Sequence, residues 1–459
     1  MVQTLEAQLD AEFVGYWESE DFLAIIDHYM ESGLIEKALR VVNLSCLRYR
    51  FQYEHYLLKA RLLFLISRSD LALDVLEEAQ DIAPKEPEIR LLRGEILCAC
   101  GQLQQALMEY EDIKCEVFGE DLSHVLIRES YIHESMKDFA SMFYSLKQVL
   151  EIDPDNNEAL EQIWMSVELS KKYEESIELH KAIIDKNPYN YRAWFNIGHA
   201  YSCIGEYELA IDALEYAFII DPDFEAAYMD CAEICFQVKQ YDRAFNIYEE
   251  GIERFGPDAE TLVFMVECLM PLGRSTEARD LLLKALTIDP YNDEVHFYLG
   301  ECHSANRKWK AAIKAYNKAI KIEDRREEYH ASIANAYEHM GDLELANHYY
   351  KKSTHIASEQ NQYWIKYATF ARKHKSLEAA LDILNKADLF AVGADLMYHK
   401  AACMYELGLE SQAIEVLEDA LMEDPTWVKN FIELCPSILK HDKITAMIEY
   451  YCGEQIIRE

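Results

Sequence analysis

The residues that could bind a metal or act as nucleophiles are scattered along this chain. It has 12 cysteines and 15 histidines in 459 residues. Cys98 and Cys100 stand two residues apart, and Cys231 and Cys235 stand four apart, but neither pair is joined by a second pair at the spacing of a zinc site. We therefore expect no metal site, and we interpret the cysteines as small apolar residues of a protein from a reducing compartment.

Sequence motifs typical of enzymes are also missing. There is no HExxH or GxSxG motif, and 15 glycines, mostly at expected turns, leave little material for a phosphate-binding loop. Histidines such as His199 and His303 fall on predicted helices without a repeated set of ligands, and carboxylate pairs such as Glu249–Glu250 are common on acidic helices. We predict no catalytic residues, no cofactor and no enzymatic activity.

Residues 191–224 show the elements that position the side chains. Two helical faces can be read from apolar residues at helical spacing. These residues are Trp194, Ile197, Gly198, Tyr201, Ala210, Leu214 and Ala217. Gly205 between the two faces can adopt the left-handed conformation that ends a helix. Pro222 ends the second helix, because it lacks the N–H group that a helix interior needs.

The same pattern returns about every 34 residues, and one small residue of the second helix is its clearest marker. The marker positions are Ala38, Ala72, Ala106, Met142, Ser176, Ala210, Ala244, Ala278, Ala312, Ala346, Ala380 and Ala413. The step is 36 residues between Ala106 and Met142 and 33 between Ala380 and Ala413. A nearly fixed period of this length predicts a stack of similar units, each in contact with its neighbours.

This motif resembles the tetratricopeptide repeat in its large apolar, small, aromatic and alanine positions. The resemblance covers residues 19–427 and implies an all-α fold, a right-handed superhelical solenoid of about twelve helix-turn-helix repeats. Repeats 1–3 span residues 19–120, and repeats 4–12 span residues 123–427. We expect residues 1–18 to form a helical lead-in and residues 428–459 to form capping helices over the last apolar face.

One region departs from the pattern. Asp121 and Leu122 are extra residues, the marker of repeat 4 is Met142, and Trp164 occupies a first-helix position that is small in most repeats. A tryptophan at this position should push neighbouring helices apart. We therefore predict a joint over residues 118–166, where two cooperative blocks would meet in native-state hydrogen exchange.

Composition limits the possible partners and compartments. The chain carries 83 acidic against 45 basic residues, a formal charge of −38, which would repel a nucleic-acid backbone. Its N-terminal sequence lacks the basic and apolar segments of a secretory signal, and no apolar run approaches the length of a membrane span. We expect a cytoplasmic protein that binds other proteins, does not bind nucleic acid and does not insert into a membrane.

The resemblance implies that first helices line a concave face through repeat positions 2, 5, 9, 12 and 13. In repeats 1–10 these 50 positions hold 17 acidic residues and only two basic ones, Arg61 and Arg192. The lining is therefore nearly twice as acidic as the chain average. Two interpretations stay open, namely a groove for a basic, partly apolar protein segment and the solvated helix faces of an acidic protein.

We predict that the partner-binding residues lie at these positions in repeats 7–10. They are Met229, Glu233, Phe236, Glu267, Met270, Phe297, Glu301 and Glu338. Apolar side chains would anchor a segment, and carboxylates would orient it. We do not expect the basic clamp with which some related proteins hold a C-terminal carboxylate, because Phe195 and Met229 stand where that clamp has lysine.

A basic stretch interrupts the acidic chain. Residues 304–375 contain 14 Lys and Arg against 8 Asp and Glu. The residues of a possible second surface are Lys310, Lys314, Lys318, Lys321, Arg372 and Lys373. The lysines recur at helical spacing, which is also typical of a solvated helix face. A second docking surface and salt-sensitive self-association are the alternatives.

The sequence thus predicts a non-catalytic scaffold or adaptor that binds a basic, partly apolar segment in an acidic groove. Two alternatives share the same fold. One is a regulatory or chaperone-like subunit of a larger complex, and the other is a scaffold that associates with itself through residues 304–375.

Overall fold

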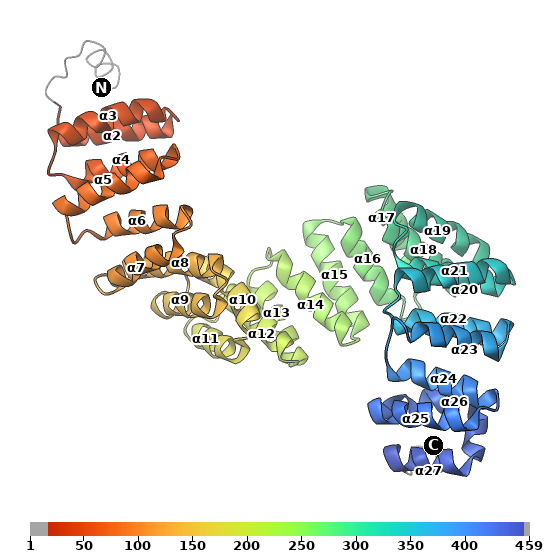
Figure 1. Cartoon of the computed structure of the whole chain (residues 1–459). Coiled ribbons are helices and arrows are strands. Elements are labelled where there is room, and N and C mark those ends of the chain that lie inside the picture. Colours follow the sequence, from red (N-terminus) through yellow and green to blue (C-terminus); the bar gives the residue numbers. More distant parts are fainter. Residues whose placement is uncertain (1–16, 454–459) are drawn as a thin grey trace. The chain divides into compact units, whose positions relative to one another are not determined.

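The computed structural model describes residues 17–453, and this part of the chain is α-helical without a β-strand. Contacts divide the chain into two compact units, Met1–Ile234 and Cys235–Glu459, and the division falls within α14. Within each unit, consecutive helices pack as pairs that follow one another along the chain (Figure 1). The helices are α2 (Ser19–Glu31), α3 (Ile35–Arg48), α4 (Tyr53–Leu65), α5 (Ser69–Ile82), α6 (Pro87–Ala99), α7 (Leu103–Lys114), α8 (Glu120–Ser135), α9 (Phe139–Ile152), α10 (Asn157–Ser170), α11 (Tyr173–Lys186), α12 (Tyr191–Cys203), α13 (Tyr207–Ile220), α14 (Glu225–Gln237), α15 (Tyr241–Phe255), α16 (Ala259–Leu269), α17 (Ser275–Ile288), α18 (Asp293–Ala305), α19 (Trp309–Ile322), α20 (Glu327–Met340), α21 (Leu343–Ile356), α22 (Asn361–His374), α23 (Leu377–Ala387), α24 (Ala394–Glu406), α25 (Glu410–Glu423), α26 (Val428–Leu434) and α27 (Asp442–Cys452), with short 3-10 turns at Pro425–Trp427 and Pro436–Lys440.

The marker residues of the second helices are buried in all twelve repeats, with at most 1% of their surface exposed. Met142 and Ser176 replace alanine in repeats 4 and 5 and are as fully buried as the alanines. The predicted pairing of helices and the position of their contact face are therefore confirmed. The fold is an all-α solenoid of helix pairs, as the period predicts.

Small residues on the first helices allow the second helices to approach closely. A Cβ atom added to Gly198 would lie 2.7 Å from Cγ of Leu214, and one added to Gly300 would lie 2.3 Å from the ring of Tyr316. Both distances are shorter than van der Waals contact. The second helix therefore packs directly on the backbone of the first at these positions.

The turn inside each pair needs a residue with left-handed backbone geometry. Gly205 fills this position in repeat 6 with φ of 83°. Lys137 in repeat 4 and Arg307 in repeat 9 adopt the same region with φ of 58° and 55°. This geometry is costly for residues with a side chain, so these turns depend on the packing of the helices on either side.

The region predicted to be a joint has two distinctive features. Helix α8 begins at Glu120, so the extra residues Asp121 and Leu122 lie in its first turn and do not lengthen the preceding loop. Helices α10 and α11 pack far less closely than the neighbouring pairs α8/α9 and α12/α13, as expected from Trp164. The Trp164 ring instead lies against His199 of α12, with ring centroids 4.7 Å apart. The joint itself stays a prediction.

Beyond the last repeat, α26 and α27 cover its apolar face. Ile444 and Ile448 of α27 are fully buried there, whereas Tyr450, on the same helix, is 83% exposed. The predicted lead-in lies outside the described residues except for Trp17 and Glu18, as do residues 454–459 of the predicted cap.

Candidate functional site

Most of the predicted partner-binding residues lie on the first helices of the second unit. Phe236 lies in α14, Glu267 in α16, Met270 directly after α16, Phe297 and Glu301 in α18, and Glu338 in α20. Met229 and Glu233, also in α14, belong to the first unit. Glu233 is exposed, whereas Met229 and Phe236 are half-buried. We call Glu267, Met270, Phe297 and Glu301 together the first-helix face of repeats 8 and 9.

The carboxylate of Glu267 is held by a tyrosine of the next repeat. The Tyr298 hydroxyl group donates a hydrogen bond to Glu267. Burial and the nearby Glu294 carboxylate raise the pKa of the Glu267 carboxyl, whereas the hydrogen bond from Tyr298 lowers it. The pKa of Glu267 is raised overall. Burial also raises the pKa of Tyr298, and Glu267, Glu294 and Glu301 raise it further. Three carboxylates therefore act electrostatically on this one tyrosine.

The carboxylate of Glu301 is held in a similar way within its own repeat. The Tyr316 hydroxyl group donates to Oε1 of Glu301 at 2.6 Å. In residues 17–453, no basic side chain forms an ion pair with Glu267 or Glu301. Glu294 differs, because Arg326 pairs with it at 2.7 Å. Glu267 and Glu301 are thus oriented carboxylates without a cation in the described part of the chain.

The two apolar members of this face are only partly available to a partner. Sδ of Met270 lies 3.8 Å from Sγ of Cys302. The Phe297 ring stacks on Tyr329 of the next repeat, with centroids 4.7 Å apart and planes at 29°. Both side chains are half-buried, so each contributes to packing between repeats and also presents an apolar surface.

Glu338 has three partners inside the chain, and one of them, Lys373, was predicted to belong to a different surface. Its carboxylate contacts Nζ of Lys373 at 2.8 Å and Nε2 of His374 at 2.9 Å, and it accepts a hydrogen bond from Tyr350 at 3.1 Å. Burial favours a higher pKa for Glu338, but hydrogen bonds from Lys373 and His374 outweigh it and lower the pKa. The predicted groove residue Glu338 and the predicted second-surface residue Lys373 are therefore an ion pair between repeats 10 and 11.

Arg372 is also engaged inside the chain. Its guanidinium group lies 2.6 Å from the Glu406 carboxylate and donates to the backbone carbonyl of Leu434 at 2.9 Å. It therefore ties repeat 11 to repeat 12 and to α26 of the cap. Arg372 and Lys373 lie on α22 and are not part of the lysine row on α19.

The four lysines of the predicted row, unlike Arg372 and Lys373, have no acidic partner in the described part of the chain. Lys310, Lys314, Lys318 and Lys321 all lie on α19 and are exposed. None of them forms an ion pair within the part of the chain that the structure describes. Lys314 and Lys318 border a groove of about 230 Å³ beside α18.

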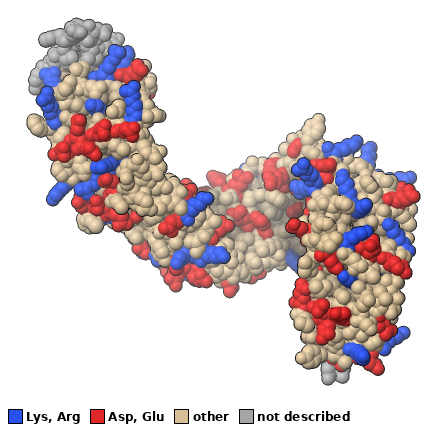
Figure 2. Space-filling view, in the orientation of Figure 1, with Lys and Arg blue, Asp and Glu red and all other residues tan. Residues whose placement is uncertain are grey.

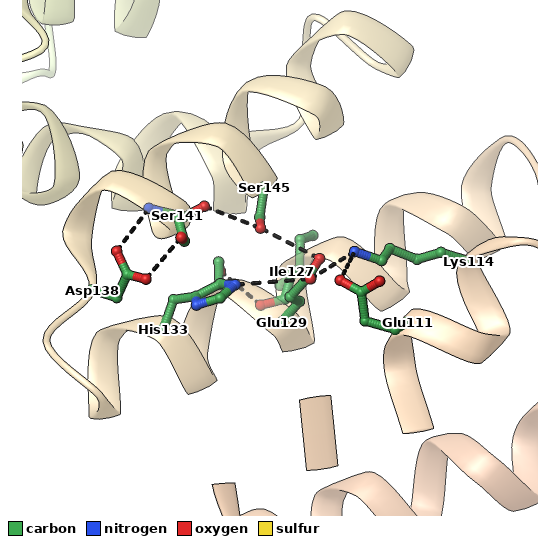
Figure 3. A network of polar contacts seen from close by, with 9 residues as sticks. Glu111, Lys114, Ile127, Glu129, His133, Asp138, Ser141 and Ser145 are labelled. Carbon is green, nitrogen blue, oxygen red and sulfur yellow. Dashed lines mark hydrogen bonds and ion pairs between the residues drawn. The ribbon is translucent and has the colours of Figure 1, made fainter. Parts of the chain in front are cut away.

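The structure also shows a buried polar network that the sequence analysis missed. Glu129 of α8 is 4% exposed and lies between side chains from three helices (Figure 3). Lys114 of α7 approaches it at 2.6 Å, His133 of α8 at 3.8 Å, and Ser145 of α9 donates at 3.4 Å. The only sequence signal is a charged residue at a repeat position that Ile197 fills in repeat 6.

Hydrogen bonding shifts the pKa values of Glu129 and Lys114 in opposite directions. Burial alone would raise the pKa of Glu129, but hydrogen bonds from His133 and Lys114 outweigh burial, so the pKa is lowered. Burial would lower the pKa of Lys114, but its hydrogen bond with Glu129 raises it. Buried Glu129 and half-buried Lys114 thus form an ion pair that joins repeats 3 and 4.

Residues 17–453 show neither a metal-binding cluster nor a membrane-spanning helix. No cluster of three or more His, Cys, Asp or Glu has the geometry of a metal site. No helix in this range combines the length and apolarity that a membrane span requires. No disulfide joins any of the 12 cysteines, all of which lie within these residues.

Comparisons with known proteins agree on the repeat. Two family models, each described as tetratricopeptide repeat, match the chain, one over residues 272–336 and the other over residues 191–224 and 327–360. The TPR repeat-containing protein YpiA of Bacillus subtilis is 22% identical over 368 residues, which cover 80% of this chain and 86% of YpiA. Hsp70-Hsp90 organizing protein 3 of Arabidopsis thaliana is 26% identical over 106 residues, 23% of this chain and 19% of that protein.

One solved structure, the APC/C hetero-tetramer Cut9-Hcn1, matches 92% of both chains at 16% identity with a TM-score of 0.40. Proteins with these repeats generally act as scaffolds for protein interaction and are generally not catalytic. The matched segments show that this chain contains tetratricopeptide repeats, and the 34-residue period and the succession of helix pairs continue the same pattern along residues 19–427.

Proposed function

We propose that this chain is a non-catalytic cytoplasmic scaffold that binds a basic, partly apolar protein segment on the first-helix face of repeats 8 and 9. The observation that carries the proposal is the state of Glu267 and Glu301. Both carboxylates are oriented by tyrosine hydroxyl groups, and neither has a cation among the described residues. None of the 12 cysteines forms a disulfide within residues 17–453, which suits a reducing compartment.

A partner cation would relieve an unfavourable arrangement. A partly buried carboxylate loses hydration, and this loss is compensated when a positive charge approaches it. Because Tyr298 and Tyr316 already fix the carboxylates, little side-chain entropy would be lost on binding. Lysine or arginine side chains of a partner are therefore the complementary groups.

Apolar side chains of the partner would contact the remaining half-exposed surface. Phe297 and Glu301 are four residues apart on α18 and so share one side of this helix. Met270 follows Glu267 by three residues at the end of α16. The overall charge of −38 would speed the approach of a basic segment and make the encounter sensitive to salt.

The test is affinity capture from native lysate with wild type and with Glu267→Gln/Glu301→Gln. Glutamine keeps an acceptor for each tyrosine but removes the charge. The matched control is Glu344→Gln/Glu359→Gln, which removes two charges from exposed residues of the same unit away from this face. Captured proteins would be identified by mass spectrometry at low and moderate salt, and their binding segments would be mapped with synthetic peptides.

We expect a partner whose mapped segment carries Lys or Arg beside apolar residues. Its capture should be lost with Glu267→Gln/Glu301→Gln and retained with the control. A partner that both variants retain equally would refute a role for these carboxylates. Stable copurification with one large complex, without any peptide that binds alone, would favour the regulatory or chaperone-like subunit instead.

A further inference from the structure

We propose that the groove beside the lysine row of α19 binds an acidic, partly apolar segment of a partner protein. We call it the lysine groove. It has a volume of about 230 Å³ and lies between α17, α18 and α19. Its lining residues are Leu286, His296, Leu299, His303, Ala311, Lys314, Ala315 and Lys318. The chain would then have two interaction surfaces with opposite charge preference.

The first support is the sign of the charges around the groove. The lining contains two lysines and two histidines but no Asp or Glu. The pKa of His303 is lowered by burial and also by the nearby cations Lys308 and Arg279. The pKa of His296 is lowered by burial and by Lys318. Cations therefore add to the effect of burial at both imidazoles, although the Pro290 carbonyl opposes it at His296, and an anion in the groove would offset these positive charges.

The absence of an internal counter-ion is the second support. Lys314 and Lys318 form no ion pair within residues 17–453, although the chain has an excess of acidic residues. The space-filling view shows Lys and Arg side chains gathered around α17 and α19 of the second unit (Figure 2). A carboxylate from outside this part of the chain would therefore find two cations that are not already paired.

The third support is the apolar floor, which argues for a protein segment. Leu286 and Leu299 line the groove together with two alanines. A side chain such as leucine could pack there beside a carboxylate. A short acidic segment can stay within the groove, whereas a long nucleic acid would extend over the rest of a chain with formal charge −38, which would repel it.

A second groove of the same kind occurs between the helices of repeats 10 and 11. It has a volume of about 280 Å³ and lies between α21, α22 and α23. Lys351, His355, Lys375 and Lys386 line it, and its one acidic residue, Asp382, is paired with Lys386 at 2.6 Å. Two basic grooves at equivalent places in the repeat favour an extended acidic segment over a single small anion.

The experiment measures fluorescence anisotropy with a labelled peptide of alternating Glu and Leu residues as the probe. The test variant is Lys314→Glu/Lys318→Glu. The matched control is Lys310→Glu/Lys321→Glu, which makes the same charge change on the same helix but outside the groove. All four lysines are exposed, so circular dichroism should show the same helical content for each variant.

We expect the test variant to bind the probe at least about tenfold more weakly than wild type, and the control to lose less than about threefold. Nuclear magnetic resonance should show the pKa of His303 rising when the probe is bound to wild type. This histidine readout separates occupation of the groove from general attraction to a basic surface.

Four results would overturn the proposal. Wild type could fail to bind the probe, or both variants could lose affinity equally, which would indicate diffuse attraction. A labelled oligonucleotide of similar length could bind better than the peptide. Finally, sedimentation could show that wild type associates with itself and that Lys314→Glu/Lys318→Glu abolishes this association, which would make a second copy the occupant.

Discussion

Two glutamates of this chain, Glu129 in repeat 4 and Glu267 in repeat 8, both lose hydration on folding, but the groups that surround their carboxylates differ. Glu129 is almost completely buried, and Lys114 and His133 approach it. Glu267 is half-buried, accepts a hydrogen bond from Tyr298 and has no cation near it in the described chain. The pKa of Glu129 is lowered, whereas that of Glu267 is raised.

The comparison separates two uses of an acidic residue in one repeat architecture. A carboxylate that is paired with a basic side chain of the same chain stabilises the fold, because its charge is already compensated. A carboxylate that is oriented but not compensated gains most from a cation that a partner supplies. Acidic composition alone does not distinguish the two cases.

The largest expected effect tests the structural member of this comparison. Lys114→Met leaves the Glu129 carboxylate buried without its closest cation. We expect the free energy of unfolding to fall by about 3 kcal/mol, because breaking a buried ion pair strands a charge. Denaturant unfolding would measure it, and hydrogen exchange should locate the loss at α7 and α8. The double variant Lys114→Met/Glu129→Met should recover most of the stability, and failure to recover would contradict this account.

The next prediction concerns the packing that orients Glu301. Gly300→Ala would place a methyl group 2.3 Å from the ring of Tyr316, which donates to Glu301. We expect a loss of about 2 kcal/mol from overpacking, together with weaker partner binding. The control Gly198→Ala crowds Leu214, where no carboxylate is held, and should reduce stability without reducing binding. Equal binding by both variants would show that the orientation of Glu301 does not matter.

The pH dependence of stability should have opposite signs for the two glutamates. The lowered pKa of Glu129 means that its stabilisation is present above the unfolded pKa of about 4.3 and is lost as the pH falls through the folded pKa. The raised pKa of Glu267 means that its ionisation opposes folding above the folded pKa, and this penalty disappears below about 4.3.

Urea unfolding between about pH 3 and pH 7 should show this difference. Glu129→Gln should be less stable than wild type at neutral pH, and the gap should narrow in acid. Glu267→Gln should be at least as stable as wild type at neutral pH, and this advantage should disappear in acid. If both variants changed the free energy of unfolding in the same direction at neutral pH, the distinction between the two sites would be wrong.

The smallest effect serves as a backbone control for both regions. Lys137→Gly in repeat 4 and Arg307→Gly in repeat 9 change residues with the same left-handed turn geometry. Each should raise the free energy of unfolding by roughly 0.5–1 kcal/mol, since relief of strain exceeds the added entropy of the unfolded chain. Calorimetry would measure both. Clearly different values would mean that the two repeats differ in their backbones and not only in their side chains.

The fold could be predicted from the sequence because the same kinds of residue recur at the same helix–helix contact in each repeat. Ala210 and its equivalents lie at the point where two helices meet, and only a residue that can be buried there permits the pair to form. Trp164 is the informative exception, because a large residue at a usually small position predicted that neighbouring helices are pushed apart, and α10 and α11 pack loosely. The extra residues at 121–122 could not be placed, because an added turn of helix and a longer loop have similar sequences.

The site was only partly accessible, because ion pairing depends on side chains that converge from different repeats. The positions of Glu338 and Lys373 in the repeat were read from the sequence, but not their contact with each other. The partners of Glu129 come from α7 and α9 as well as α8, and no local pattern signals that convergence. Charge counts identified an acidic lining and could not show which carboxylates are compensated.

The most direct measurement determines partner capture and thermal stability together for Glu267→Gln/Glu301→Gln. If these carboxylates bind a cation of a partner, capture will be lost while the melting temperature stays unchanged or rises. If capture persists and the melting temperature falls, Glu267 and Glu301 are structural residues like Glu129, and the first-helix face of repeats 8 and 9 is not the binding site.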